Sequence, residues 1–156
     1  MIQFDLRGLV EALNVHGVEF IAIGGVAVGA QGFVRATEDL DIVPDPAPEN
    51  LDRLIGVLAD LDASLPTAED RPFDRTRDGL AMRRSANVTA NTRLGSLDVV
   101  QIAEGVPSYA QLDEDAADAE IAGVPIRVCS LARLRAMKRA QGRAIDLADL
   151  EGLPDQ

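Results

Sequence analysis

The chain has 156 residues, 47% of them hydrophobic and 26% charged, and 15 Lys and Arg against 26 Asp and Glu give it a formal charge of −11. These values are typical of one globular domain, which we expect to span residues 1–156. No run in the sequence approaches the roughly 18 consecutive apolar residues of a membrane span. The acidic charge argues against a protein that coats nucleic acid by neutralising phosphates, but not against an enzyme that contacts RNA through a local basic patch. A single cysteine excludes an intramolecular disulfide, and the first residues lack the pattern of a signal peptide. We therefore expect a cytoplasmic protein without membrane contact.

Helices alternate with strands in the predicted first half of the chain. The assignments rest on apolar residues at helical spacing and on short apolar runs that end at Gly or Pro. In chain order the expected elements are a helix over residues 5–16, a strand over 18–23, a helix over 26–33, a strand over 38–43 and a helix over 49–61. Residues 66–78 are polar and contain proline, which predicts a surface loop, and Arg83 and Arg84 are expected on a strand beside the one that carries Asp98.

Hairpins dominate the predicted second half. In chain order we expect strands over residues 87–92 and 96–102, a second hairpin around 120–128, a helix that begins at Ser130 and a short helix after Arg143. Helices that alternate with strands, followed by hairpins, predict an α/β fold with a mixed β-sheet flanked by helices. We expect its core over residues 18–102, with the C-terminal hairpin and helices over 116–152.

Two acidic residues on one predicted strand are the first candidates for chemistry. Alternate side chains of a strand face the same way, so Asp39 and Asp41 share a face, with Cα atoms roughly 7 Å apart. Two charges at that distance repel by about 2 kcal/mol at an effective dielectric constant of 20. The repulsion favours a compensating cation, and oxygen ligands suit Mg²⁺ or Mn²⁺.

A third acid, Asp98, lies within the apolar run Leu97-Asp98-Val99-Val100. If the two strands are neighbours, it joins Asp39 and Asp41 in a cluster of three carboxylates, which can hold divalent ions. The Gly24–Gly25 turn at the end of a strand offers backbone amides to an anion. Each feature alone has an ordinary explanation: a solvated edge strand, a simple turn or a surface acid. Their combination favours a site for metal and phosphate.

These residues, in this order, resemble the DNA polymerase β-like nucleotidyltransferase superfamily, whose pattern is a glycine turn, a short helix, a D-x-D strand and a third carboxylate on a later strand. The segment from Gly24–Gly25 through Arg35-Ala36-Thr37-Glu38-Asp39-Leu40-Asp41-Ile42 looks most like the branch that contains AbiEii-type toxins. The tail, from Leu134 to Lys138 and then from Arg143 through Asp146 and Asp149, is similar to the closing lysine and R-x-x-D helices of that branch.

The resemblance implies a nucleotidyltransferase-like fold and the transfer of a nucleoside monophosphate from a nucleoside triphosphate to a hydroxyl acceptor. It implies that Asp39, Asp41 and Asp98 are catalytic and ligate Mg²⁺ or Mn²⁺. Gly24 and Gly25, with Arg35 and Lys138, are implied to bind the nucleotide, although Arg35 also fits an ordinary surface charge. One departure is Gly25, which stands where many relatives have serine.

Three alternatives remain open for the function. A toxin of a toxin–antitoxin system would modify tRNA or protein and would have an antitoxin partner; the Arg35-x-Thr37 context favours this alternative, although the chain is short for a toxin of this branch. A small-molecule enzyme of the lincosamide or aminoglycoside type is favoured by the acidic charge, because acidic walls attract cationic drugs. A non-catalytic, antitoxin-like interaction protein with this fold is the third alternative.

Overall fold

The computed structural model describes residues 4–67 and 69–155. Eight strands form one mixed sheet in the order β4-β3-β5-β6-β2-β1-β8-β7. The strands are β1 (Phe20–Ile23), β2 (Asp39–Pro44), β3 (Ser64–Leu65), β4 (Arg71–Pro72), β5 (Val88–Thr92), β6 (Gly95–Val99), β7 (Ala117–Ile121) and β8 (Val124–Val128). β2 pairs with β6 and β1 with β8 in parallel, and the other pairs are antiparallel. The predicted mixed sheet is confirmed.

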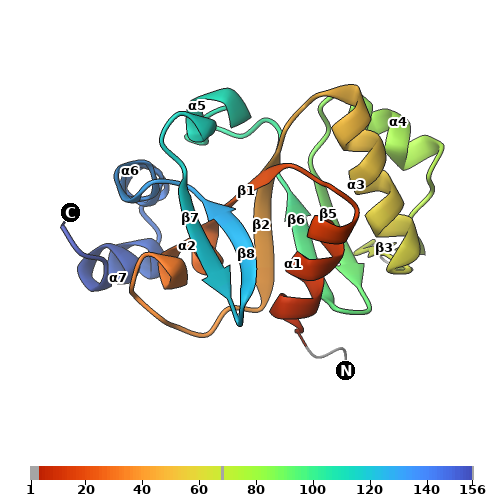
Figure 1. Ribbon diagram of the computed structural model, residues 1–156. Helices are drawn as coiled ribbons and strands as arrows, with labels where there is room; N and C mark the ends of the chain where they lie inside the picture. The colour runs from red at the N-terminus through yellow and green to blue at the C-terminus, as the bar shows by residue number, and fades with distance from the viewer. Residues whose placement is uncertain (1–3, 68, 156) are drawn as a thin grey trace.

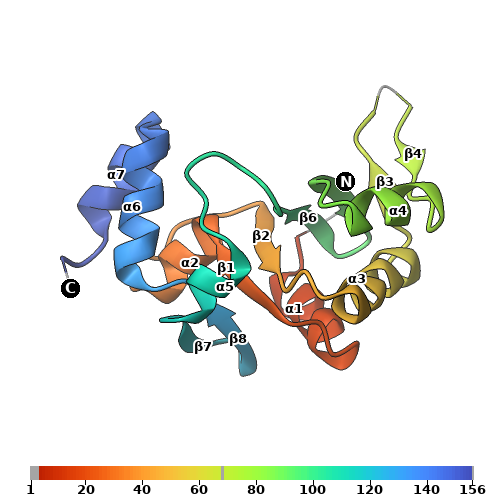
Figure 2. The same ribbon diagram turned by 90° about the horizontal axis from the view of Figure 1, so that it is seen from above.

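Seven helices flank this sheet within the described residues (Figure 1). They are α1 (Leu6–Val15), α2 (Gly24–Ala30), α3 (Pro48–Asp60), α4 (Arg77–Arg83), α5 (Tyr109–Asp113), α6 (Leu131–Gln141) and α7 (Ala144–Gly152). Figure 2 shows α6 and α7 together at one end of the molecule and α4 with β3 and β4 at the other. None of the described helices has the length and hydropathy that a membrane-crossing segment requires.

The core forms where apolar stripes of helices meet the inward side of the sheet. Leu9 and Leu13 of α1 and Leu54 and Leu58 of α3 are fully buried, and they belong to the same apolar cluster as Leu40 and other sheet residues. Asp5 begins α1 as predicted, because its side chain accepts a hydrogen bond from the Gly8 amide. Alternation along β2 places the apolar residues in this core and turns the acidic residues to the other face.

Two predictions in the middle of the chain were wrong. Residues 66–78 contain part of a short β3–β4 hairpin and the beginning of α4, and are therefore not simply a surface loop. Asp74 accepts hydrogen bonds from two backbone amides at the start of α4, which stabilise the helix. Arg83 ends that helix and Arg84 follows it, so neither residue lies on a strand. The five-residue helix α5 was also missed.

Candidate active site

The three predicted carboxylates meet on one face of the sheet. β2 and β6 pair in parallel, with Asp41 in register with Asp98, so their side chains leave neighbouring strands side by side. Asp39, two residues earlier on β2, faces the same way. One oxygen of each of the three carboxylates lies within 4.8 Å of the others. The expected cluster therefore exists, and its donors are all oxygen.

The cluster carries more negative charge than its surroundings stabilise. Burial, followed by a hydrogen bond with Asp98, raises the pKa of Asp41 to about 8. Burial and the nearby charge of Asp98 also raise the pKa of Asp39. The Asp98 Oδ1 atom is buried and accepts no hydrogen bond from the described residues. A buried carboxylate oxygen without a donor is costly, and a cation bound between the three side chains would remove that cost.

Gly24 and Gly25, the predicted glycine turn, are the first two residues of α2 and lie directly against this cluster. β1 is antiparallel to β2, with Ile23 opposite Asp41, so Gly24 begins beside the carboxylate. Gly24 has a φ of +67°, and a Cβ atom there would lie 2.1 Å from Asp41 Oδ2. Glycine is therefore required both for the backbone conformation and for the close approach of the acid.

Two basic side chains, those of Arg35 and Lys138, lie near the glycine turn and the carboxylate cluster. A Cβ atom on Gly25 would lie 2.9 Å from Thr37 Oγ1 and 3.2 Å from the Arg35 Nη2 atom. Lys138 of α6 lies close enough to Asp41 for its charge to oppose the rise in the pKa of that residue. Arg35 and Lys138, the two predicted phosphate contacts, thus line the same cleft as the glycine turn and the three carboxylates.

Both cations are held by carboxylates of α7. Arg35 Nε and Nη2 donate to the two oxygens of Asp149 at 2.7 and 3.0 Å. Lys138 Nζ lies 3.2 Å from Asp146 and 3.1 Å from Asp149. Asp146 also accepts a hydrogen bond of 2.7 Å from Arg143 Nε. Burial acts to raise the pKa of Asp146, but the hydrogen bonds from Arg143 and Lys138 outweigh it and lower the pKa to about 2.

Local sequence explains how α6 and α7 bring these groups together. Gly142 adopts the left-handed conformation and ends α6, and the Asp146 side chain accepts from the Arg143 amide where α7 begins. The sharp reversal places Lys138 opposite the first two turns of α7. The resemblance covers this segment, Asp149 included, but the pairing of Asp149 with Arg35, 114 residues away, was not predicted.

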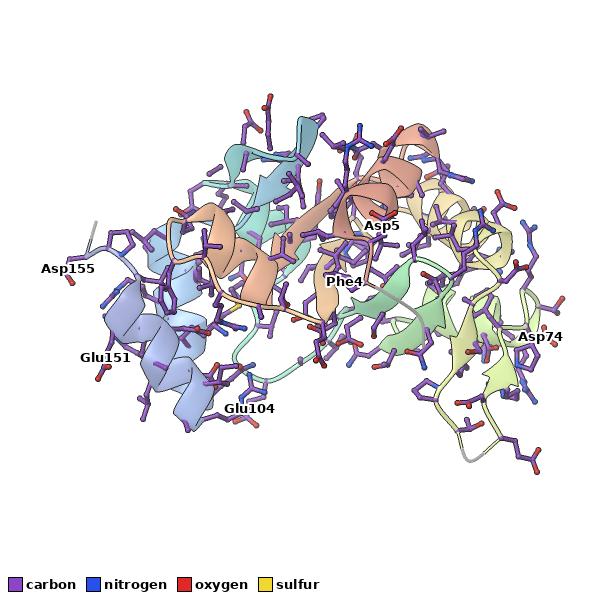
Figure 3. The ribbon with its side chains drawn as sticks, turned by 90° about the horizontal axis from the view of Figure 1, so that it is seen from below. Phe4, Asp5, Asp74, Glu104, Glu151 and Asp155 are labelled. Carbon is purple, nitrogen blue, oxygen red and sulfur yellow. The ribbon has the colours of Figure 1, made fainter. Side chains whose placement is uncertain are left out.

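A cleft of about 690 Å³ connects these features. Its lining includes the three carboxylates, the glycine turn, Arg35 and Lys138, and it continues along the connection between β6 and α5. Figure 3 shows Glu104 of this connection at the end of the molecule occupied by α6 and α7. A Cβ atom on Gly105 would lie 3.3 Å from Ala140 of α6, so the connection closely approaches that helix.

No protein-family model matches the sequence, and no curated protein does. Solved structures do match the fold at a probability of 1.00. TM1012 of Thermotoga maritima, assigned as a nucleotidyltransferase, is 16% identical with a TM-score of 0.58, over 94% of this chain and 88% of the other. The solution structure of the antibiotic-resistance factor ANT(2'')-Ia is 16% identical with a TM-score of 0.60, over 92% and 77%.

The crystal structure of ANT(2'')-Ia in complex with adenylyl-2''-tobramycin matches as well, with a TM-score of 0.50 at 16% identity over 92% of this chain and 91% of the other. The predicted fold class is therefore confirmed: this chain has the mixed α/β fold of nucleotidyltransferases. The likeness extends over 92–94% of the chain.

Proposed function

We propose that the chain is a metal-dependent nucleotidyltransferase that transfers a nucleoside monophosphate from a nucleoside triphosphate to a hydroxyl acceptor. The observation that carries this proposal is the meeting of Asp39, Asp41 and Asp98 beside the Gly24–Gly25 turn. Three carboxylates without a cation repel one another, and the raised pKa of Asp41 reflects that repulsion together with burial. The arrangement favours a divalent cation and an anionic substrate rather than a purely structural role.

The donor set fits a hard divalent cation such as Mg²⁺ or Mn²⁺, because its three members are carboxylates and one buried oxygen has no partner in the described chain. Asp39, Asp41 and Asp98 would hold the cation. When bound, it would neutralise the charge of the transferring phosphate and of the leaving pyrophosphate.

Residues of the chain bind the triphosphate and accept the proton of the acceptor. The backbone of Gly24 and Gly25 and the side chains of Arg35 and Lys138 bind the triphosphate. Asp98 accepts the proton of the acceptor hydroxyl. The acceptor oxygen then forms a bond to the α-phosphorus as the bond to pyrophosphate breaks, so the nucleoside monophosphate moves to the acceptor.

Labelled nucleotides test this activity directly. The protein is incubated with Mg²⁺ and each of the four labelled triphosphates in turn, with candidate acceptors, and transfer of label and release of pyrophosphate are measured. We expect one triphosphate at least to be used and Asp41→Asn to abolish transfer. Asp78→Asn is the control, because Asp78 pairs with Arg71 in α4 and β4, at the other end of the sheet. Absence of nucleotide binding with every triphosphate would refute the proposal.

Two acceptor classes follow from different observations. The Arg35-x-Thr37 context and its place beside Gly25 favour a toxin of the AbiEii type that modifies tRNA or protein and is neutralised by an antitoxin. The charge of −11 and the likeness to ANT(2'')-Ia favour a small-molecule acceptor. Overexpression distinguishes them: a toxin stops growth and its Asp39→Ala variant does not, whereas a small-molecule enzyme leaves growth unchanged.

A further inference from the structure

Two residues of the segment between α2 and β2, Phe33 and Arg35, contact α7. The Phe33 ring packs on Gly152 so closely that a Cβ atom there would lie 2.5 Å from the ring carbons. Two residues further along, Arg35 forms its two-point ion pair with Asp149. The Asp149 side chain is fully buried, while 22% of the Arg35 side chain is exposed. This segment continues into β2, the strand that carries Asp39 and Asp41. Its contacts with α7 therefore hold it in position beside the carboxylate cluster.

The ion pair leaves part of the guanidinium available to a ligand. Arginine has five N–H donors, and hydrogen bonds among the described residues occupy three of them: two to Asp149 and one from Nη1 to the Ala36 carbonyl. The two donors left are on Nη1 and Nη2, the atoms that approach Gly25. Asp149 therefore holds the guanidinium by one edge and presents the other toward the glycine turn.

The same carboxylate also orients the second cation. Lys138 Nζ donates a hydrogen bond to Asp146 Oδ1 at 3.2 Å and lies 3.1 Å from Asp149 Oδ2. Three basic side chains (Arg35, Lys138 and Arg143) and two acidic ones (Asp146 and Asp149) give this group a charge of 3 − 2 = +1. Asp146 and Asp149 reduce the positive charge of the group, which by itself would weaken the binding of an anion. Their contribution to an anion site must therefore come from the orientation that they impose on Arg35 and Lys138.

We infer that Asp149 is a positioning residue, which fixes the Arg35 guanidinium over the glycine turn so that its free edge contacts the phosphates of the substrate. The inference rests on the proposed function. Glycine at position 25 fits this arrangement, because a Cβ atom there would lie 2.9 Å from Thr37 Oγ1 and 3.2 Å from Arg35 Nη2. Asp149 itself contacts no substrate and acts through Arg35.

A double-mutant cycle tests this dependence. The ligand is Mg²⁺ with inorganic tripolyphosphate, which omits the unknown base, and its dissociation constant is measured by calorimetry for the wild type, Asp149→Asn, Arg35→Gln and the double variant. Loss of one oriented, charge-assisted contact is expected to weaken binding about tenfold in either single variant. The double variant is expected to bind within about twofold of Arg35→Gln, because the Arg35 contact is already lost and Asp146 still holds Lys138. Effects that multiply, or an Asp149→Asn protein with unchanged affinity, would overturn the inference.

Two further variants separate orientation from structural support. Asp78→Asn removes the acid from a similar two-point pair with Arg71, with both distances 2.9 Å, and is expected to lower the melting temperature without changing the dissociation constant. Arg35→Lys keeps the charge beside Asp149 but loses the second donor, and is expected to bind about tenfold more weakly. If Asp149→Asn does not fold, Arg35→Lys decides: wild-type affinity would overturn the inference.

The failure of this inference differs from the failure of the proposed function. If the wild-type protein binds neither Mg²⁺ nor tripolyphosphate, the nucleotidyltransferase proposal fails and the inference fails with it. If the wild type binds both and the cycle is additive, only the role of Asp149 is refuted. Binding of Mg²⁺ alone is expected to be equal in the wild type and Asp149→Asn, since Asp149 lies outside the carboxylate cluster.

Discussion

Protons should compete with the divalent cation at the carboxylate cluster. The pKa of Asp41 is about 8, raised mainly by burial and by Asp98, so the cluster holds a proton at neutral pH in the absence of a cation. A metal must displace that proton. For one group of this pKa, the deprotonated fraction falls about 50-fold between pH 8 and pH 6, and the apparent affinity for Mg²⁺ or Mn²⁺ should fall by the same factor.

Calorimetry at pH 6, 7 and 8, in buffers of different protonation enthalpy, measures both the affinity and the protons released. About one proton should leave for each cation bound at pH 7. Asp41→Asn should bind more weakly and lose most of the pH dependence. Asp78→Asn should keep the wild-type slope, because the hydrogen bond from Arg71 lowers the pKa of Asp78 away from this range. Affinity that stays constant from pH 6 to pH 8, with no proton release, would refute the reasoning.

The raised pKa of Asp41 also affects the stability of the metal-free protein, which should fall as the pH rises, whereas the affinity for the metal should increase. A carboxyl whose pKa is raised by folding stabilises the protein below its unfolded value of 3.8, and this contribution is lost as the pH rises through about 8. The metal-free protein should therefore melt at a lower temperature at pH 8 than at pH 6. Added Mg²⁺ should raise the melting temperature more at pH 8 than at pH 6.

Three other substitutions have effects that the structure specifies. Gly24→Ala places a Cβ atom 2.1 Å from Asp41 Oδ2 at a φ of +67°, and should cost about 1–2 kcal/mol of folding free energy and weaken Mg²⁺ binding, as measured by urea denaturation and calorimetry. Leu97→Ala removes a fully buried side chain of β6, next to Asp98 in sequence, and should cost about 2–5 kcal/mol in the same denaturation assay. Asp146, with a pKa of about 2, stabilises the protein above its unfolded pKa of 3.8, and that contribution is lost as the pH falls toward 2. The free energy of unfolding of Asp146→Asn should therefore depend less on pH in the acidic range than that of the wild type, as measured by urea denaturation at several pH values.

The carboxylate cluster could be predicted from sequence because its signal is local on each strand. In Glu38-Asp39-Leu40-Asp41-Ile42 the alternation of acidic and apolar residues fixes which side chains share a face. What the alternation leaves open is the register between β2 and β6, which depends on pairing between segments more than 50 residues apart. The family resemblance supplied that link, and the structure places Asp41 beside Asp98.

The network around Asp149 was not predicted because its partners are distant in sequence. Arg35 and Asp149 are separated by 114 residues, and neither residue type indicates from the sequence that the two form a pair. The missed helix α4 has a different cause. Its sequence, RDGLAMR, is short and contains glycine, so helix propensity is low. Capping by Asp74 and the Arg71–Asp78 pair stabilise it, and of these only the capping residue leaves a local sequence signal.

Anomalous scattering from a crystal soaked with Mn²⁺ and a non-hydrolysable triphosphate tests the central claim most directly. We predict manganese peaks within coordination distance of Asp39, Asp41 and Asp98, with the phosphates over Gly24 and Gly25. Manganese bound elsewhere on the protein, with no peak among these three carboxylates, would contradict it.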